Sequence, residues 1–181
     1  FLLLFVGSIN NININNLKFY NIKNINVTGL ENEDNQIVLK KIKSLNLENI
    51  FLVNKKEISS EIEANNLVEK FFIFKRYPSS LHINIDKTKF LARISKNGKI
   101  FHLGSNGKLI ENSYLNNQIP FVFGNPEITE FFNIKQIIDE SNISFEDIKN
   151  LYFYSSKRWD LELSNNMIIK LPSDNIIEGL K

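Results

Sequence analysis

The sequence has no cysteine, and its 181 residues include only seven glycines, four prolines and one tryptophan. The absence of cysteine excludes a disulfide framework, a thiolate metal site and a cysteine nucleophile, although it does not exclude an exported bacterial protein. A net charge of only +2 is also too small to indicate nucleic-acid binding, because the cations are spread along the chain rather than gathered in a block.

What remains is the composition of a folded protein. Hydrophobic residues make up 43% of the chain and charged residues 23%, and phenylalanine alone occurs 15 times. This balance is typical of globular rather than disordered chains. The length fits one ordinary domain or two small ones.

The two ends suggest a fragment. The sequence opens on an apolar run, Phe1–Val6, which is too short to span a bilayer by itself. A buried strand or helical turn would explain this run, but the tail of a membrane helix is the favoured interpretation, with residues 1–17 as its end and a short linker. At the other end, a helix expected from Asp174 stops after barely two turns, so we expect residues to be missing at both ends.

The first half predicts a small α+β unit. An alternating segment over 18–30 predicts a strand that closes on Gly29. Helices are expected over 33–45 and over 54–65, the second with Asn54 and Glu57 in a capping box. The expected inner face of the first helix consists of Ile37, Val38, Ile42 and Leu45.

A strand–turn–strand segment from Val68 to Ile85 completes this unit and leads into the second half of the chain. Its turn is Tyr77–Ser80, in which Pro78 is expected at position i+1. The order strand, helix, helix, strand, strand places two helices on one face of a small sheet. We therefore interpret the hairpin as the joint between two small domains.

The second half predicts short strands. Hairpin turns are expected at Asn97-Gly98 and Asn106-Gly107, because both residue types accept positive φ. The segment 119–124 reads as a sheet edge because it contains Pro120. A helix is expected from an Asn125 cap to about Glu140. Further strands are expected over 151–154, 159–163 and 167–171.

Catalytic chemistry has little support in this sequence. His82 is expected on the solvent side of a strand, and His102 has no second ligand at metal spacing. The chain contains no Walker A, GxGxxG, GxSxG or HExxH pattern. The sequence therefore predicts no enzyme, no metal, no cofactor and no small-molecule substrate.

Two basic pairs stand out, Lys75-Arg76 and Lys157-Arg158. Solvated surface charge would explain both. Docking of an acidic protein segment would also explain them, and the first pair could lie close to phospholipid. The single tryptophan, Trp159, alternates with Leu161 and Leu163 and is expected to anchor a core.

In this order and spacing, the motifs resemble those of the FtsQ family, also called DivIB, of single-span bacterial cell-division proteins. The resemblance covers nearly the whole chain. The motifs that carry it are the apolar start, Ile25–Gly29, Asn49–Phe51, Arg76–Ile85, Ala92, the Ile119-Pro120 segment and Trp159–Leu163. The family's Glu-Arg-x-Pro-x-Ala motif is reduced here to Ala92 and Asp86, which leaves the hinge conformation open.

The resemblance implies a POTRA domain of order β-α-α-β-β over 18–87, followed over 88–181 by a mixed, mainly antiparallel β domain with flanking helices. It implies an inner-membrane protein with most of its chain in the periplasm, which acts as a divisome scaffold during septation. Its implied partners are FtsB, FtsL and FtsK. The principal FtsB-binding strand of the family lies beyond Asp174, so the expected remnant of that surface is Ser155, Ser156, Lys157 and Arg158. The residues expected to join the domains are Arg76, Tyr77, Pro78 and Leu81.

Two alternatives compete with this interpretation. A POTRA-bearing outer-membrane assembly or transport factor would share the first unit. However, the sequence shows neither a second POTRA copy nor long alternating barrel strands. A periplasmic peptidoglycan hydrolase would need converging titratable residues, which the sequence does not offer.

Overall fold

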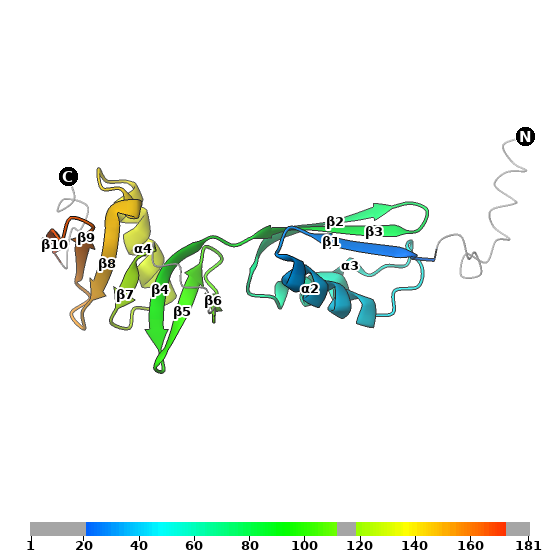
Figure 1. The fold of residues 1–181 in the computed structure, drawn as a ribbon, viewed down its shortest axis with the longest axis horizontal. Coiled ribbons are helices and arrows are strands. Elements are labelled where there is room, and N and C mark those ends of the chain that lie inside the picture. The colour runs from blue at the N-terminus through cyan, green and yellow to red at the C-terminus, as the bar shows by residue number, and fades with distance from the viewer. Residues whose placement is uncertain (1–20, 112–118, 173–181) are drawn as a thin grey trace, which may run out of the picture. The chain divides into compact units, whose positions relative to one another are not determined.

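The computed structural model describes residues 21–111 and 119–172, and the chain divides into two units between Lys87 and Thr88 (Figure 1). The first unit consists, in order, of β1 (Asn24–Thr28), α2 (Asn32–Ser44), α3 (Lys55–Glu63), β2 (Val68–Arg76) and β3 (Ser80–Lys87). This order confirms the predicted α+β arrangement of strand, helix, helix, strand, strand.

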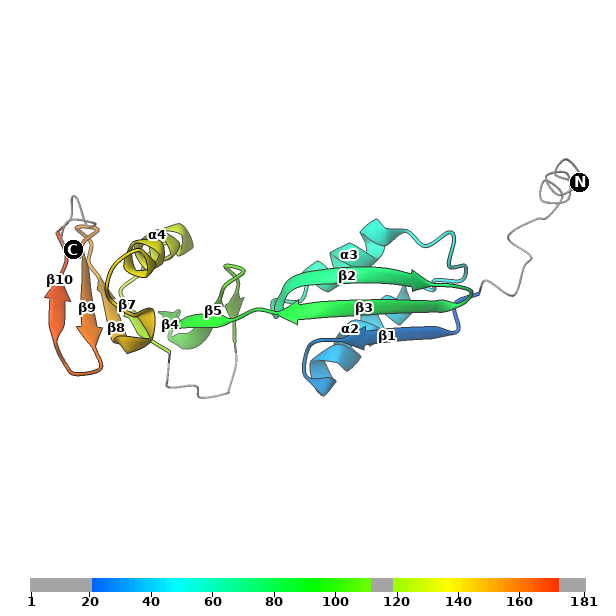
Figure 2. The same ribbon diagram turned by 90° about the horizontal axis from the view of Figure 1, so that it is seen from above.

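The first sheet has the strand order β1-β3-β2, with β1 parallel and β2 antiparallel to the central β3 (Figure 2). Alternate residues point to opposite faces of such a sheet. One face packs against α2 and α3. The core between this face and the helices consists of Val27, Leu81, Ile83 and Ile85 from the strands and Val38, Ile42, Ile58 and Ile62 from the helices. The opposite face carries Phe72 and Phe74, which are 50% and 52% exposed and whose rings stack at 6.3 Å.

The two helices of this unit differ in detail from their predicted ends and faces. Ile37 is 49% exposed, so the prediction that it belongs to the inner face of α2 was wrong. The buried residues of this helix are Val38 and Ile42. Asn54 is the N-cap of α3, and its side chain accepts a hydrogen bond from the Lys56 amide at 3.0 Å. Glu57 does not complete the predicted capping box, because it accepts from the Asn54 side-chain amide instead.

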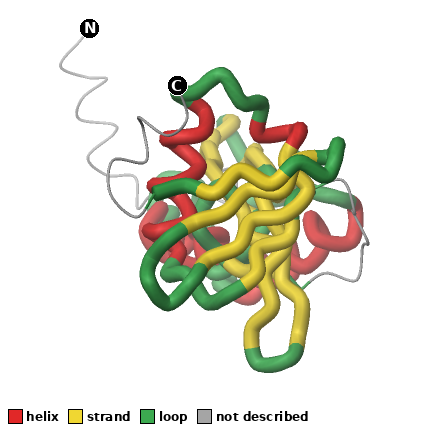
Figure 3. Tube along the Cα trace, turned by 90° about the vertical axis from the view of Figure 1, so that its left-hand side faces the viewer, coloured by secondary structure: helices red, strands yellow, loops and turns green. Residues whose placement is uncertain are grey.

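The second unit is built on a seven-stranded sheet with the strand order β10-β9-β8-β7-β4-β5-β6 (Figure 3). It consists of β4 (Phe90–Lys96), β5 (Lys99–Gly104), β6 (Leu109–Ile110), β7 (Phe121–Phe123), α4 (Ile128–Asp139), β8 (Ile148–Phe153), β9 (Trp159–Leu163) and β10 (Ile168–Lys170). Most neighbours are antiparallel, whereas β7 is parallel to both β4 and β8. The prediction of a mixed, mainly antiparallel β domain is confirmed.

The central position of β7 corrects the prediction that 119–124 forms a sheet edge. Pro120 lies just before the strand, so the sheet does not need its missing N–H group. Its carbonyl accepts a hydrogen bond from the Arg93 amide at 2.8 Å, which continues the pairing of β7 with β4. Proline therefore adjoins a central strand here without interrupting it.

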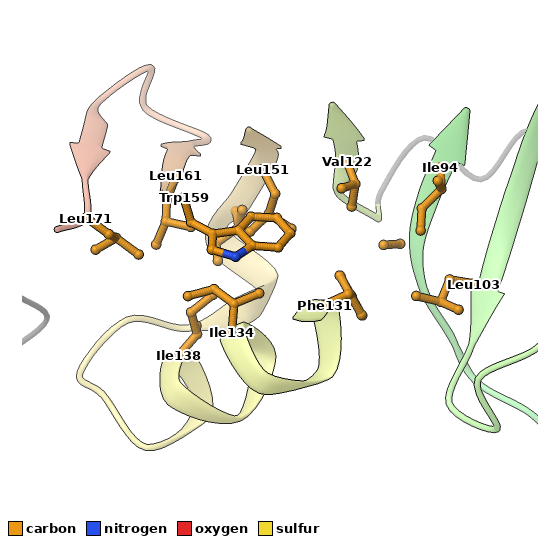
Figure 4. Close-up of a cluster of buried hydrophobic side chains, with 12 residues drawn as sticks. Ile94, Leu103, Val122, Phe131, Ile134, Ile138, Leu151, Trp159, Leu161 and Leu171 are labelled. Atoms are coloured by element: carbon orange, nitrogen blue, oxygen red, sulfur yellow. The ribbon is translucent and has the colours of Figure 1, made fainter. Parts of the chain in front are cut away.

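Helix α4 covers one face of this sheet and closes the core (Figure 4). Phe131, Ile134 and Ile138 point from the helix toward the strands, and Trp159 is only 3% exposed, as its alternation predicts. The strand side of the core is formed by Ala92, Ile94, Leu103, Val122, Ile148, Leu151, Leu161 and Leu171.

Two local predictions in this unit need correction. The N-cap of α4 is Glu127 rather than Asn125, and the Glu127 amide donates to the Glu130 carboxylate at 2.9 Å. Asn97-Gly98 forms the predicted turn, with φ of 54° and 77°. At Asn106-Gly107 only the glycine has positive φ. The turn there spans Gly104–Gly107, and the Gly107 amide donates to the Gly104 carbonyl at 3.0 Å. The helix predicted from Asp174 lies outside the described residues.

Candidate partner-binding surface

The turn between β2 and β3 combines an exposed aromatic residue with a buried anchor. Tyr77 is 58% exposed and stacks on Phe51 at 4.9 Å, whereas Leu81 is fully buried beneath the helices. The Tyr77–Pro78 peptide bond is cis, and Arg76 pairs with Ser80 across the turn. Arg76, Tyr77 and Pro78 precede β3, whereas the boundary between the units follows its other end.

The turn between β8 and β9 contains the four predicted partner-binding residues. The Tyr154 amide donates to the Arg158 carbonyl at 3.0 Å, and the Lys157 amide donates to the Tyr154 carbonyl at 2.8 Å. Lys157 adopts a left-handed conformation with φ of 62°. Ser155, Ser156 and Lys157 are exposed, so the turn offers two hydroxyl groups and an ammonium group to solvent.

The two cations of this turn have different surroundings. Arg158 donates to both carboxylate oxygens of the buried Asp160, at 3.1 and 3.3 Å, and its guanidinium lies 4.7 Å from the centre of the Tyr154 ring. These contacts hold Arg158 against the sheet. Lys157 is 81% exposed, and its ammonium group lies 3.6 Å from Glu130. An exposed pair of this kind is weak, so Lys157 is the cation that an acidic partner could engage.

A row of aromatic side chains, which the sequence analysis did not identify, crosses the sheet face opposite α4. Phe123 lies 4.7 Å from Phe121 and 4.9 Å from Tyr152, and Phe123 is 43% exposed. We call Phe121, Phe123 and Tyr152 the aromatic row. The alternation Phe121-Val122-Phe123 was the available signal, because a buried Val122 puts both phenylalanines on the other face.

Charged groups border this row at both ends. The Arg93 guanidinium lies 5.6 Å from the Phe121 ring, and the Tyr152 hydroxyl donates to Glu162 at 2.6 Å. Glu162 also accepts hydrogen bonds from Asn150 at 2.8 Å and from Lys149 at 3.2 Å. The bonds from Asn150, Tyr152 and Lys149 lower the pKa of Glu162 to about 2. The same carboxylate, followed by burial, raises the pKa of Tyr152.

His102 is buried on β5, but on the sheet face opposite its core-facing neighbour Leu103. It is 3% exposed and packs 5.1 Å from the Phe90 ring, and neither ring nitrogen has a hydrogen-bond partner among the described residues. Burial, followed by the charge of Arg93, lowers its pKa. Residues 21–111 and 119–172 contain no group of three histidine, aspartate or glutamate side chains placed to hold a metal ion.

The membrane helix tail predicted for residues 1–17 lies outside the described residues. Within the part of the chain that the structure describes, no helix combines the length and apolar character needed to span a bilayer.

Comparison with known proteins gives matches over most of the chain. Residues 20–87 match the family described as "POTRA domain, FtsQ-type". The cell division protein FtsQ of Rickettsia bellii is 23% identical over 170 residues, a match that covers 87% of this chain and 60% of the relative. Cell division protein DivIB of Staphylococcus aureus is 26% identical over 89 residues, which cover 49% of this chain and 20% of the relative.

Among solved structures, the extracytoplasmic domain of the trans isomer of DivIB from Geobacillus stearothermophilus matches with a TM-score of 0.40 at 11% identity. This match covers 52% of the present chain and 87% of that domain. The chain spans about 60% of the length of the Rickettsia relatives that it matches. Residues 20–87 thus match an FtsQ-type POTRA domain, and the chain is related to cell division proteins named FtsQ and DivIB.

Proposed function

We propose that this protein is a scaffold of the division machinery, anchored in the inner membrane by one N-terminal helix, with most of the chain in the periplasm. The similarity to known proteins carries the proposal: the Rickettsia relatives named as cell division proteins match over 87% of this chain. In the proposed organisation, residues 1–17 end the anchor, 18–87 form the POTRA domain and 88–181 form the β domain. Strand β3 leads from the POTRA domain into the β domain, whereas the Arg76–Leu81 hairpin lies at the other end of that strand.

The proposed partners are division proteins of the FtsB and FtsL type, with FtsK contacting the POTRA half. In the second unit, the β8–β9 turn and the aromatic row offer two kinds of contact. Lys157 supplies an exposed cation for an acidic segment, and Phe123 supplies exposed aromatic area of the kind that forms interface anchors. Arg158 supports this surface by fixing Tyr154 and Asp160 rather than by reaching outward.

We propose a binding role without catalysis. Within the described residues, the pKa departs from its ordinary value at Glu162, Tyr152 and His102. The first two groups are hydrogen-bonded to each other, and the third is buried beside Phe90. A general acid or base must instead have its proton within reach of a bound substrate.

The experiment is to follow the protein in its own cells. A fluorescent fusion is expected to gather at the division site, and depletion is expected to block septation and give filaments. Uniform membrane fluorescence together with normal septation during depletion would contradict the proposal. A fusion that carries Met167→Asp, in the β9–β10 turn and so at the other end of β9 from the β8–β9 turn, is the control and is expected to behave like the parent protein.

A further inference from the structure

We infer that one end of the POTRA domain docks on the surface of an anionic phospholipid bilayer. This inference deepens the proposed function and rests on its membrane anchor. The surface consists of Phe51, Leu52 and Tyr77, which we call the membrane patch. These side chains are 46%, 65% and 58% exposed, and the first and last stack at 4.9 Å.

The patch has the mixed composition of an interfacial site. Arg76 and Lys23 are exposed beside the β2–β3 turn, and the Lys23 amide donates to the Ser79 carbonyl of that turn at 2.8 Å. Aromatic and aliphatic groups enter the headgroup region while neighbouring cations attract anionic lipids. A protein partner would not require this combination, whereas an anionic bilayer complements both halves of it.

The loop that presents the patch is held in place. The Lys75 ammonium group donates to the carbonyl oxygens of Phe51 and Val53, at 3.4 and 3.5 Å. Val53 is buried, whereas its neighbour Leu52 points outward. The loop therefore exposes its apolar side chains while its backbone is tied to β2.

Chain continuity puts this end of the domain near the membrane. Asn21 forms an antiparallel bridge with Asn49, and the Ile22 amide donates to the backbone carbonyl of Glu48 at 2.9 Å. The chain thus enters the unit beside the α2–α3 loop and the β2–β3 turn, at one end of the sheet (Figure 2). Fourteen residues separate Val6 from Asn21, and a chain of this length spans at most about 50 Å. If the apolar run lies in the bilayer, the patch is within reach of its surface.

The absence of native cysteine permits a site-specific test. Leu52→Cys is introduced into the whole chain and labelled with an environment-sensitive fluorophore; Phe74→Cys, which replaces a side chain 52% exposed on the same unit, is the matched control. With phosphatidylglycerol vesicles containing brominated acyl chains, the label at 52 is expected to shift to the blue and to be quenched. The label at 74 is expected to remain in water.

A second set of variants separates the patch from the anchor. In a chain carrying L2S, L3S and L4S, the combined change F51S, L52S and Y77S is expected to weaken vesicle binding by at least about tenfold. The pair F72S and F74S is expected to leave vesicle binding unchanged. Neutral vesicles and high salt are also expected to weaken binding.

The outcomes are distinguishable. If the parent chain sediments with vesicles while the label at 52 stays in water, the anchor stands and the docking proposal is overturned. If the chain carrying L2S, L3S and L4S still binds and the label at 52 is quenched, docking stands without any contribution from the apolar run. If neither chain sediments with vesicles, both the proposed membrane anchor and the proposed docking of the membrane patch are overturned.

Discussion

Replacing Gly124 with alanine should destabilise the second unit far more than the same change at Gly98. Both glycines have positive φ, 91° and 77°. A Cβ on Gly124 would lie 2.2 Å from the Phe153 carbonyl oxygen, whereas a Cβ on Gly98 would meet nothing within 4 Å. The comparison therefore separates a steric clash from backbone strain.

The expected magnitudes follow from these two contributions. An alanine in the left-handed region costs about 1–2 kcal/mol at either position. At Gly124 the strands must also part, and overpacking of this kind costs about 1–3 kcal/mol more. Gly98→Ala should thus cost about 1–2 kcal/mol of unfolding free energy and Gly124→Ala about 2–5 kcal/mol.

Urea unfolding followed by tryptophan fluorescence measures this difference. Trp159 is the only tryptophan and is buried in the core of the second unit, so its emission reports that unit. The urea dependence of the free energy should be unchanged in both variants. Equal destabilisation by the two substitutions would refute the reasoning, because it would mean that β7 and β8 do not approach each other closely at Gly124. Since Gly124 follows Phe123, Gly124→Ala should also displace the aromatic row.

Three further predictions concern the same unit. Tyr152→Phe removes one hydrogen bond to Glu162, so the pKa of this carboxyl, observed by carbon NMR, should rise from about 2 toward the ordinary 4.5. Because the folded-state pKa is depressed, the stabilisation by Glu162 is present above pH 4.5 and is lost as pH falls toward 2; an unchanged pKa in Tyr152→Phe would contradict this assignment. The lowered pKa of His102 means that the unfolded chain binds a proton first as pH falls below 6.5, so acidification should reduce stability there, and His102→Leu should remove that part of the pH dependence. Phe131→Ala should cost about 3–5 kcal/mol by Trp159 fluorescence because its ring is fully buried between α4 and the sheet, and a cost below about 1 kcal/mol would contradict that packing.

Local signals in the sequence were sufficient for much of the fold. Alternation in β3 predicted that His82 lies on the solvent side of the strand, and its neighbours Leu81 and Ile83 are indeed buried. Asn54 and Asn97-Gly98 were identified because capping and left-handed turns depend on a few adjacent residues.

Features that depend on distant pairing were missed. β7 lies between β4 and β8 because Phe121 pairs with Arg93 on one side and Asn150 on the other, and no local pattern encodes these neighbours. The aromatic row depends on the same register, which brings Phe123 opposite Tyr152. The predicted partner-binding turn was located by resemblance, but the sequence alone did not indicate that Asp160 already engages Arg158.

The central claim is that the aromatic row and the β8–β9 turn bind the partners of the proposed division scaffold. The most direct measurement is the affinity of the whole protein for a purified FtsB-like and FtsL-like pair, compared with that of Phe123→Asp, Lys157→Glu and the control Met167→Asp. Phe123→Asp is expected to weaken binding by at least about tenfold, the loss typical of an interface anchor, and Lys157→Glu to slow association in a salt-dependent manner. The control, which replaces a side chain 51% exposed in the β9–β10 turn, should bind like the parent protein. Unchanged affinity and association rate in the first two variants would contradict the account.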